Sequence, residues 1–132
     1  MFMIKPFSEE YSSDMFQTVL RYCQNYSSFK VLILLADNIE ISQCFNNISE
    51  QDVKTIKSFR IVTQQQFQID FHNNSKMWFF TPSESKGLRV NALIYSHKIP
   101  KRIVDVIYNP MLIQYCNRTG NNETLDFNNR RI

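Results

Sequence analysis

Glycine is scarce in this chain of 132 residues, which contains only Gly87 and Gly120. A loop that cradles a phosphate normally needs glycines, because side chains keep the backbone away from the anion. The scarcity therefore argues against a nucleotide-binding loop.

Cysteine and histidine are few, and they are not spaced as metal ligands. Cys23, Cys44 and Cys116 form no C-x-x-C pair, so no zinc site is expected. Cys23 and Cys44 fall within apolar helical patterns and are expected to be buried thiols. The two histidines, His72 and His97, lack a spaced Cys, Asp or Glu partner and are expected in solvated turns. The sequence thus predicts neither a metal nor a cofactor.

Long apolar runs and long charged runs are also missing. The run at residues 31–36 is far shorter than the roughly 20 apolar residues that a membrane-spanning helix needs. No signal-peptide pattern is visible, so we expect an intracellular protein without a membrane anchor. The net charge is +3 and no basic run exceeds two residues, so charge alone does not predict nucleic-acid binding.

The residues that are abundant suit one folded domain. Hydrophobic residues make up 43% of the chain and aromatic residues 14%, which is enough for a single core. We expect one α/β domain over residues 1–116, followed by a polar and flexible tail at residues 117–132.

Apolar periodicity predicts alternating helices and strands. Helices are expected at residues 14–25, 37–48, 49–57 and 100–108. Strands are expected at residues 2–5, 29–36, 59–62, 67–71, 76–81 and 90–95.

The patterns within these strands predict how the layers are arranged. Residues 29–36 are almost entirely apolar after Lys30, which is typical of a strand covered on both faces by helices. Apolar and polar residues alternate over residues 67–71, and a turn at residues 72–75 leads into the next strand, which predicts an antiparallel hairpin. The expected fold is a three-layer α/β sandwich with a mainly parallel central sheet and an added antiparallel hairpin.

Residues 67–112 also carry a family resemblance. A turn at Asn74 and Ser75 is followed by a loop at residues 86–89 and then by a strand at residues 91–95. In this respect the chain resembles the ATPase domain of viral DNA-packaging terminase large subunits, over roughly residues 5–113. The resemblance implies a degenerate P-loop-NTPase-like fold in a viral or prophage protein of the host cytoplasm or nucleus.

The chain departs from that family at the catalytic positions. The family's P-loop, G-x-x-x-x-G-K-[ST], falls on residues 7–14, "FSEEYSSD", which we expect to form a polar turn. This stretch has no glycine or lysine, and Glu9 and Glu10 would repel a triphosphate. The acidic pair that holds Mg²⁺ and activates water is replaced by Ser96 and His97. The resemblance therefore implies a pseudo-ATPase.

Three functional hypotheses follow, with the oligomeric state left open. The first is a non-catalytic protein that binds another protein, regulating or mimicking a motor or packaging subunit. The second is a nucleic-acid-binding module at the carboxyl ends of the strands, where α/β folds usually bind ligands. The third is an enzyme of unrecognised type that uses His97, with Ser96. The candidate partner or nucleic-acid contacts are Lys86, Arg89, Lys98, Lys101, Arg102 and Trp78.

Overall fold

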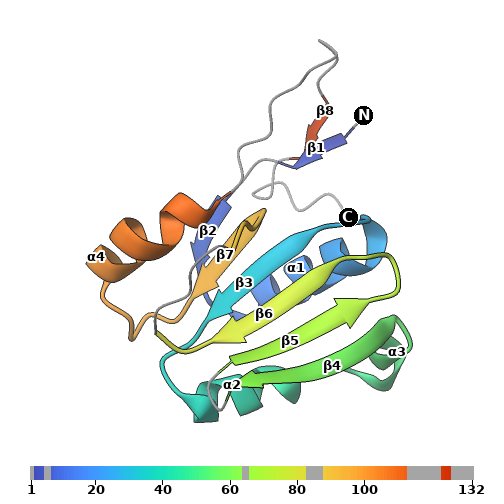
Figure 1. The fold of residues 1–132 in the computed structure, drawn as a ribbon, viewed down its shortest axis with the longest axis horizontal. Helices are drawn as coiled ribbons and strands as arrows, with labels where there is room; N and C mark the ends of the chain where they lie inside the picture. The colour runs from blue at the N-terminus through green and yellow to red at the C-terminus, as the bar shows by residue number, and fades with distance from the viewer. Residues whose placement is uncertain (1, 5–6, 64–65, 83–87, 113–122, 126–132) are drawn as a thin grey trace.

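The computed structural model describes residues 2–4, 7–63, 66–82, 88–112 and 123–125, and it contains a six-stranded mixed sheet (Figure 1). The strands of this sheet lie in the order β2-β7-β3-β6-β5-β4. Their bounds are β2 Phe7–Glu10, β3 Lys30–Leu34, β4 Ile56–Thr63, β5 Gln66–Phe71, β6 Lys76–Phe80 and β7 Ala92–Tyr95. The helices are α1 Ser13–Asn25, α2 Asn38–Phe45, α3 Glu50–Val53 and α4 Lys101–Ile103, which continues as a π-helix Val104–Tyr108 and a 3-10 helix Asn109–Met111.

The sheet is mostly parallel, as the sequence predicts. Strands β2, β7, β3 and β6 pair in parallel, whereas β5 runs antiparallel to both β6 and β4. The predicted hairpin is β5–β6. Strand β4 is longer than the predicted residues 59–62, because it starts at Ile56, directly after α3, and pairs along β5.

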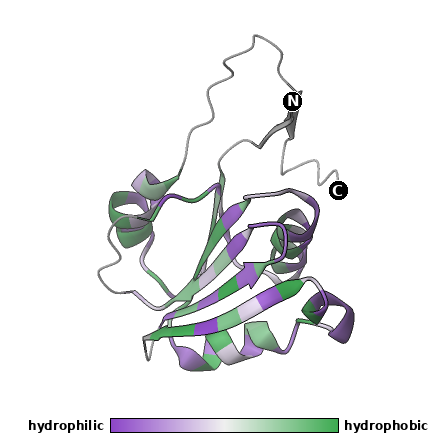
Figure 2. Cartoon of the chain, turned by 45° about the vertical axis from the view of Figure 1, so that its right-hand side comes forward, coloured by the Kyte–Doolittle hydropathy of each residue, from purple (hydrophilic) through white to green (hydrophobic). Residues whose placement is uncertain are grey.

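Two apolar cores lie on the two faces of the sheet. Along β3, Val31 and Ile33 belong to the core that α1 and α2 cover, whereas Leu32 and Leu34 belong to the core beneath the π-helix. Figure 2 shows hydrophobic and hydrophilic residues alternating along the β4–β5 side of the sheet. We call the face of the sheet that points away from α1 and α2 the front face. On β4 and β5 this face bears polar side chains that belong to neither core.

Local capping explains where the helices begin. The Ser12 hydroxyl accepts a hydrogen bond from the Met15 N–H at 3.1 Å, so α1 starts at Ser13, one residue before the predicted helix at residues 14–25. Helix α2 starts after Asp37, as predicted. Helix α3 ends at Val53, well before the predicted residue 57, because the chain joins the sheet from Ile56.

The prediction of a polar turn at residues 7–14 is wrong. Residues 7–10 form β2, which pairs with β7 from Phe7 opposite Ala92 to Glu10 opposite Tyr95. Strand β2 is an edge strand, and an edge strand tolerates polar residues because one side of it faces solvent.

The chain ends are described only in part. Strand β1, Phe2–Ile4, pairs in parallel with β8, Glu123–Leu125, in a separate two-stranded sheet. Strand β8 falls within the tail expected from residue 117, and the rest of that tail lies outside the described residues. The predicted domain boundary at residue 116 also lies there and stays a prediction.

Candidate functional site

Hydrogen bonds to one side chain join the carboxyl ends of β3 and β7. Ser96, which follows β7, is buried, and its hydroxyl donates to Glu40 Oε2 at 3.1 Å. The other Glu40 oxygen accepts from the Ala36 N–H at 2.7 Å. Both carboxylate oxygens of Glu40 therefore hold the two strand ends together. His97, the next residue, is exposed, as expected for a turn histidine.

The connection between β2 and α1 consists of two residues, Tyr11 and Ser12. The Tyr11 N–H donates to the Tyr95 carbonyl at 2.7 Å, and the Tyr11 ring packs against Phe16 with centroids 6.4 Å apart. Ser12 caps the helix that follows. A connection this short has no room for a loop of the G-x-x-x-x-G-K-[ST] length between strand and helix.

The predicted contact residues have different environments. Arg89, Lys98, Lys101 and Arg102 are exposed, and Lys86 lies outside the described residues. These side chains remain predicted contacts.

Trp78 does not offer an exposed stacking surface. Its side chain on β6 is only 8% exposed, and its indole N–H donates to Gln68 Oε1 at 3.0 Å. Trp78 is thus packed within the sheet. Its burial does not support a role as a stacking contact.

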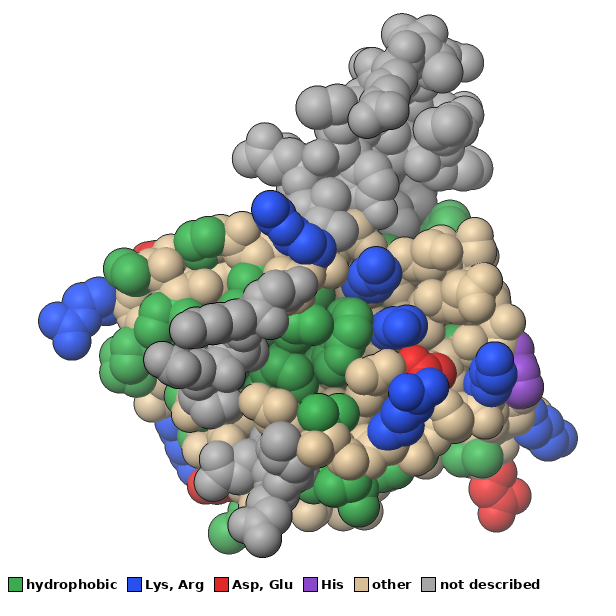
Figure 3. Space-filling view, viewed as in Figure 1, with side chains coloured by type: hydrophobic (Ala, Val, Ile, Leu, Met, Phe, Trp, Pro, Cys, Tyr) green, Lys and Arg blue, Asp and Glu red, His purple; other side chains and the backbone are tan. Residues whose placement is uncertain are grey.

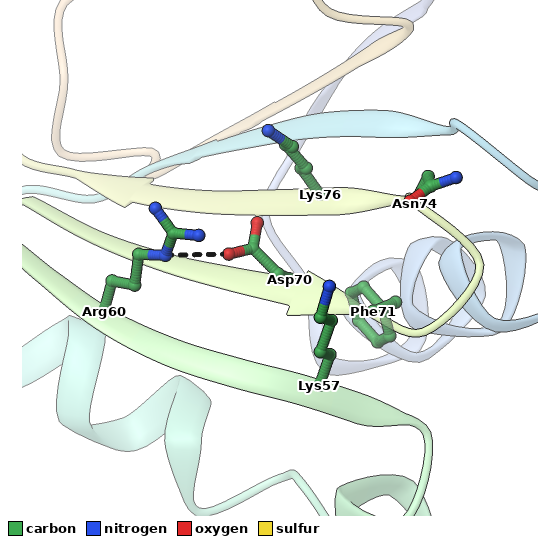
Figure 4. Close-up of a pocket in the computed structure, with 6 residues that line it drawn as sticks. All are labelled: Lys57, Arg60, Asp70, Phe71, Asn74 and Lys76. Carbon is green, nitrogen blue, oxygen red and sulfur yellow. Dashed lines mark ion pairs between the residues drawn. The ribbon is translucent and has the colours of Figure 1, made fainter.

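A polar pocket of about 160 Å³ lies on the front face of the sheet, over β4, β5 and β6 (Figures 3 and 4). Figure 3 shows Lys and Arg side chains gathering around one acidic group on this face. Cross-strand pairing brings them together, because Lys76 on β6 lies beside both Lys30 on β3 and Asp70 on β5. The residues that line the polar pocket are Lys57, Arg60, Asp70, Phe71, Asn74 and Lys76.

Asp70 is the hydrogen-bonding centre of this pocket. Its Oδ2 accepts from Ser58 Oγ at 3.0 Å and forms an ion pair with Arg60 Nε at 3.0 Å. Its Oδ1 accepts from Gln68 Nε2 at 2.7 Å, and Gln68 in turn accepts from Trp78. The network therefore runs in one direction, from the indole through the amide to the carboxylate.

The environment of Asp70 favours the ionised carboxylate. Burial alone would raise its pKa, but hydrogen bonds from Gln68 and Ser58 and the positive charges of Arg60 and Lys76 outweigh burial. The pKa of Asp70 consequently lies below its ordinary value. The carboxylate is thus a fixed negative charge beneath the surrounding cations.

The outer edge of the sheet at β4 carries exposed apolar side chains. Phe59, Ile61 and Val62 are 49%, 70% and 50% exposed. Phe59 packs against the core that α1 and α2 cover, on the rear face of the sheet, because its ring contacts Phe45 with centroids 5.2 Å apart. Among the strands that the structure describes, β4 has β5 as its sole neighbour. We refer to Phe59, Ile61 and Val62 on this strand as the β4 edge.

The cysteines do not form a reactive or metal-binding site in the described part of the chain. Cys23 and Cys44 are free and buried, and burial raises the pKa of both thiols, to about 11 for Cys44. Cys116 lies outside the described residues. Among the described residues, no group of three or more His, Cys, Asp or Glu side chains could hold a metal ion.

Neither the polar pocket nor the β4 edge was predicted from the sequence, although the polar pocket had a signal there. The alternation at residues 67–71 placed Gln68 and Asp70 on the face opposite Phe67, Ile69 and Phe71. A charged residue on that face suggests a cross-strand partner, but Arg60 could be found only once the register of β4 was known.

The comparisons with known proteins add no assignment. No helix in the described ranges has the length and apolar character needed to cross a membrane. No protein-family model, curated protein or solved structure matches the chain.

Proposed function

We propose that the chain is a non-catalytic binding protein whose partner adds an extended segment to the β4 edge. The observation that carries this proposal is an edge strand with three large, exposed apolar side chains. Exposed edges of this kind pair readily with another chain, since the backbone N–H and C=O groups on the outer side have no strand to bond.

The regular part of β4 limits the partner to a short segment. Register shifts between Ile56 and Ser58 and between Ile61 and Thr63 interrupt the pairing at both ends. The stretch between them, residues 58–61, is the part that can pair regularly. Apolar side chains of the partner would pack beside Phe59 and Ile61 on the rear face.

The charges on the front face favour an acidic partner over a second copy of the chain. Arg60 and Lys57 are exposed on the front side of β4. Two copies joined antiparallel through β4 would bring the cations of both onto one face, which destabilises the pairing. Acidic side chains of a different segment would instead be attracted. On the terminase-like hypothesis, that segment would belong to a subunit of a packaging motor.

Selection of random displayed peptides on the immobilised protein tests the proposal. We expect enriched peptides to alternate apolar and acidic residues, and their synthetic forms to bind in fluorescence anisotropy. The substitution Ile61→Lys should abolish that binding, because it puts a long charged side chain on the apolar side of the edge.

Val106→Lys is the matched control. Val106 lies on the π-helix and is 69% exposed, against 70% for Ile61, so both substitutions place lysine at an exposed apolar position. The control should bind the peptides as the wild type does. Peptides that bind Ile61→Lys as tightly as wild type, or a selection that enriches nothing, would contradict the proposal.

A further inference from the structure

We propose that the polar pocket binds a phosphate dianion, either free or as a monoester, through Arg60, Lys57 and Lys76. This inference does not depend on the β4 edge accepting a partner. It rests on how three cations from two strands surround one buried carboxylate (Figure 4).

Arg60 is held in a position suited to an oxyanion. Asp70 engages its Nε at 3.0 Å, and no other described residue pairs with the guanidinium. The two terminal amino groups of Arg60 are then left as a planar fork, the arrangement that binds phosphate or carboxylate oxygens in pairs. Asp70 therefore positions Arg60 and does not itself contact the ligand.

The two lysines supply the charge that Asp70 does not balance. Neither Lys57 nor Lys76 forms an ion pair with a described side chain. Asp70 is 7% exposed, and its oxygens accept from groups within the sheet. Three cations and one carboxylate leave a net charge of +2 in the polar pocket. A phosphate monoester carries a charge of about −1.5 to −2 near neutral pH, which matches that value.

The shape of the polar pocket favours the phosphate group over a base or a nucleic-acid strand. A volume of about 160 Å³ is well below the range typical of sites that enclose a whole organic ligand. Phe71, which lines the polar pocket, and Trp78, which is linked to Asp70 through Gln68, are 2% and 8% exposed, so neither provides a face for base stacking. The anionic group alone would be recognised.

Isothermal titration calorimetry with inorganic phosphate, phosphoserine and dimethyl phosphate tests the inference at low salt. We expect phosphate and phosphoserine to bind, and dimethyl phosphate, a diester with one charge, to bind more weakly. Between about pH 5 and pH 7.5 the affinity for phosphoserine should rise about tenfold, because the second pKa of a phosphate monoester is about 6 and the dianion is the ligand. Dimethyl phosphate should show no such rise.

Lys76→Gln tests the polar pocket without changing the β4 edge, because Lys76 lies on β6. We expect this substitution to weaken phosphate binding about tenfold, the effect of one charge-assisted hydrogen bond. Lys101→Gln, an exposed lysine on α4, should change it less than about twofold. Ile61→Lys should leave phosphate binding intact, so that failure of this inference and failure of the proposed function remain distinct.

Three results would overturn the inference. They are no heat of binding with phosphate or phosphoserine, equal affinity in wild type and Lys76→Gln, and phosphoserine affinity that does not vary with pH. A single-stranded oligonucleotide without a terminal phosphate that displaces phosphate, with an affinity falling steeply in salt, would assign this face to nucleic acid instead.

Discussion

Replacing Asp70 with asparagine should cost the fold about 2–3 kcal/mol at pH 7. The Trp78 indole N–H can only donate, so Gln68 must turn its Oε1 toward Trp78 and its Nε2 toward Asp70. Asparagine has one acceptor oxygen where aspartate has two. If that oxygen keeps Ser58 and Arg60, its amide N–H₂ meets the Gln68 amide N–H₂, and one buried donor is left unpaired.

The magnitude follows from these contacts. An unpaired buried donor costs about 1–3 kcal/mol. The loss of the carboxylate charge beside Arg60 adds less than about 1 kcal/mol, because the Arg60 side chain is 65% exposed and solvent screens the pair. Urea unfolding followed by circular dichroism measures the difference in the free energy of unfolding. Asp105→Asn is the control, because Asp105 is exposed and keeps an acceptor for Asn109.

The same substitution has a predicted pH dependence. The pKa of Asp70 is lowered in the folded state, so its carboxylate stabilises the fold above the ordinary pKa of about 3.9. That stabilisation is lost as the pH falls through the lowered folded pKa. The gap between wild type and Asp70→Asn should therefore stay constant from pH 7 down to about pH 4 and narrow as the pH falls further. A gap below about 0.5 kcal/mol at pH 7, or one that widens in acid, would refute the assigned network.

Two further predictions concern the core behind the sheet. Phe79→Ala should destabilise the fold by about 3–5 kcal/mol in urea unfolding, because the ring is fully buried between Phe16 and Phe45. The control Val106→Ala should change the free energy of unfolding by less than about 0.5 kcal/mol. Similar losses in both variants would contradict the assigned burial. Cys23 and Cys44 should resist alkylation at pH 8 in the folded protein and react once it is unfolded in urea, because burial raises both thiol pKa values. Peptide mapping locates the labelled cysteines. Rapid labelling of either one in the native state would contradict their burial.

The parts of the fold with strong local signals were predictable from the sequence. The apolar stretch around Val31–Leu34 and the Asp37 cap each specify their element through residues close in the chain. The alternation in β5 did the same for the hairpin. Residues 7–10 were misassigned because polar side chains on an edge strand resemble a turn when the neighbouring strand is unknown.

The site was less predictable because its contacts join distant parts of the chain. Ser96 and Glu40 are 56 residues apart, and their hydrogen bond depends on how β7 lies beside β3. Arg60, Asp70 and Lys76 come from three strands, and a register shift of one residue would point them to opposite faces. The sequence holds these residues, but only the strand pairing brings them together.

Amide hydrogen exchange of the wild-type protein, with and without a selected peptide, tests the central claim most directly. If the partner extends the sheet, exchange should slow at residues 58–61 of β4 and stay unchanged at α4 and the π-helix, which lie on another part of the surface. Slowed exchange that spares β4 and appears at α4 instead would contradict binding at the β4 edge.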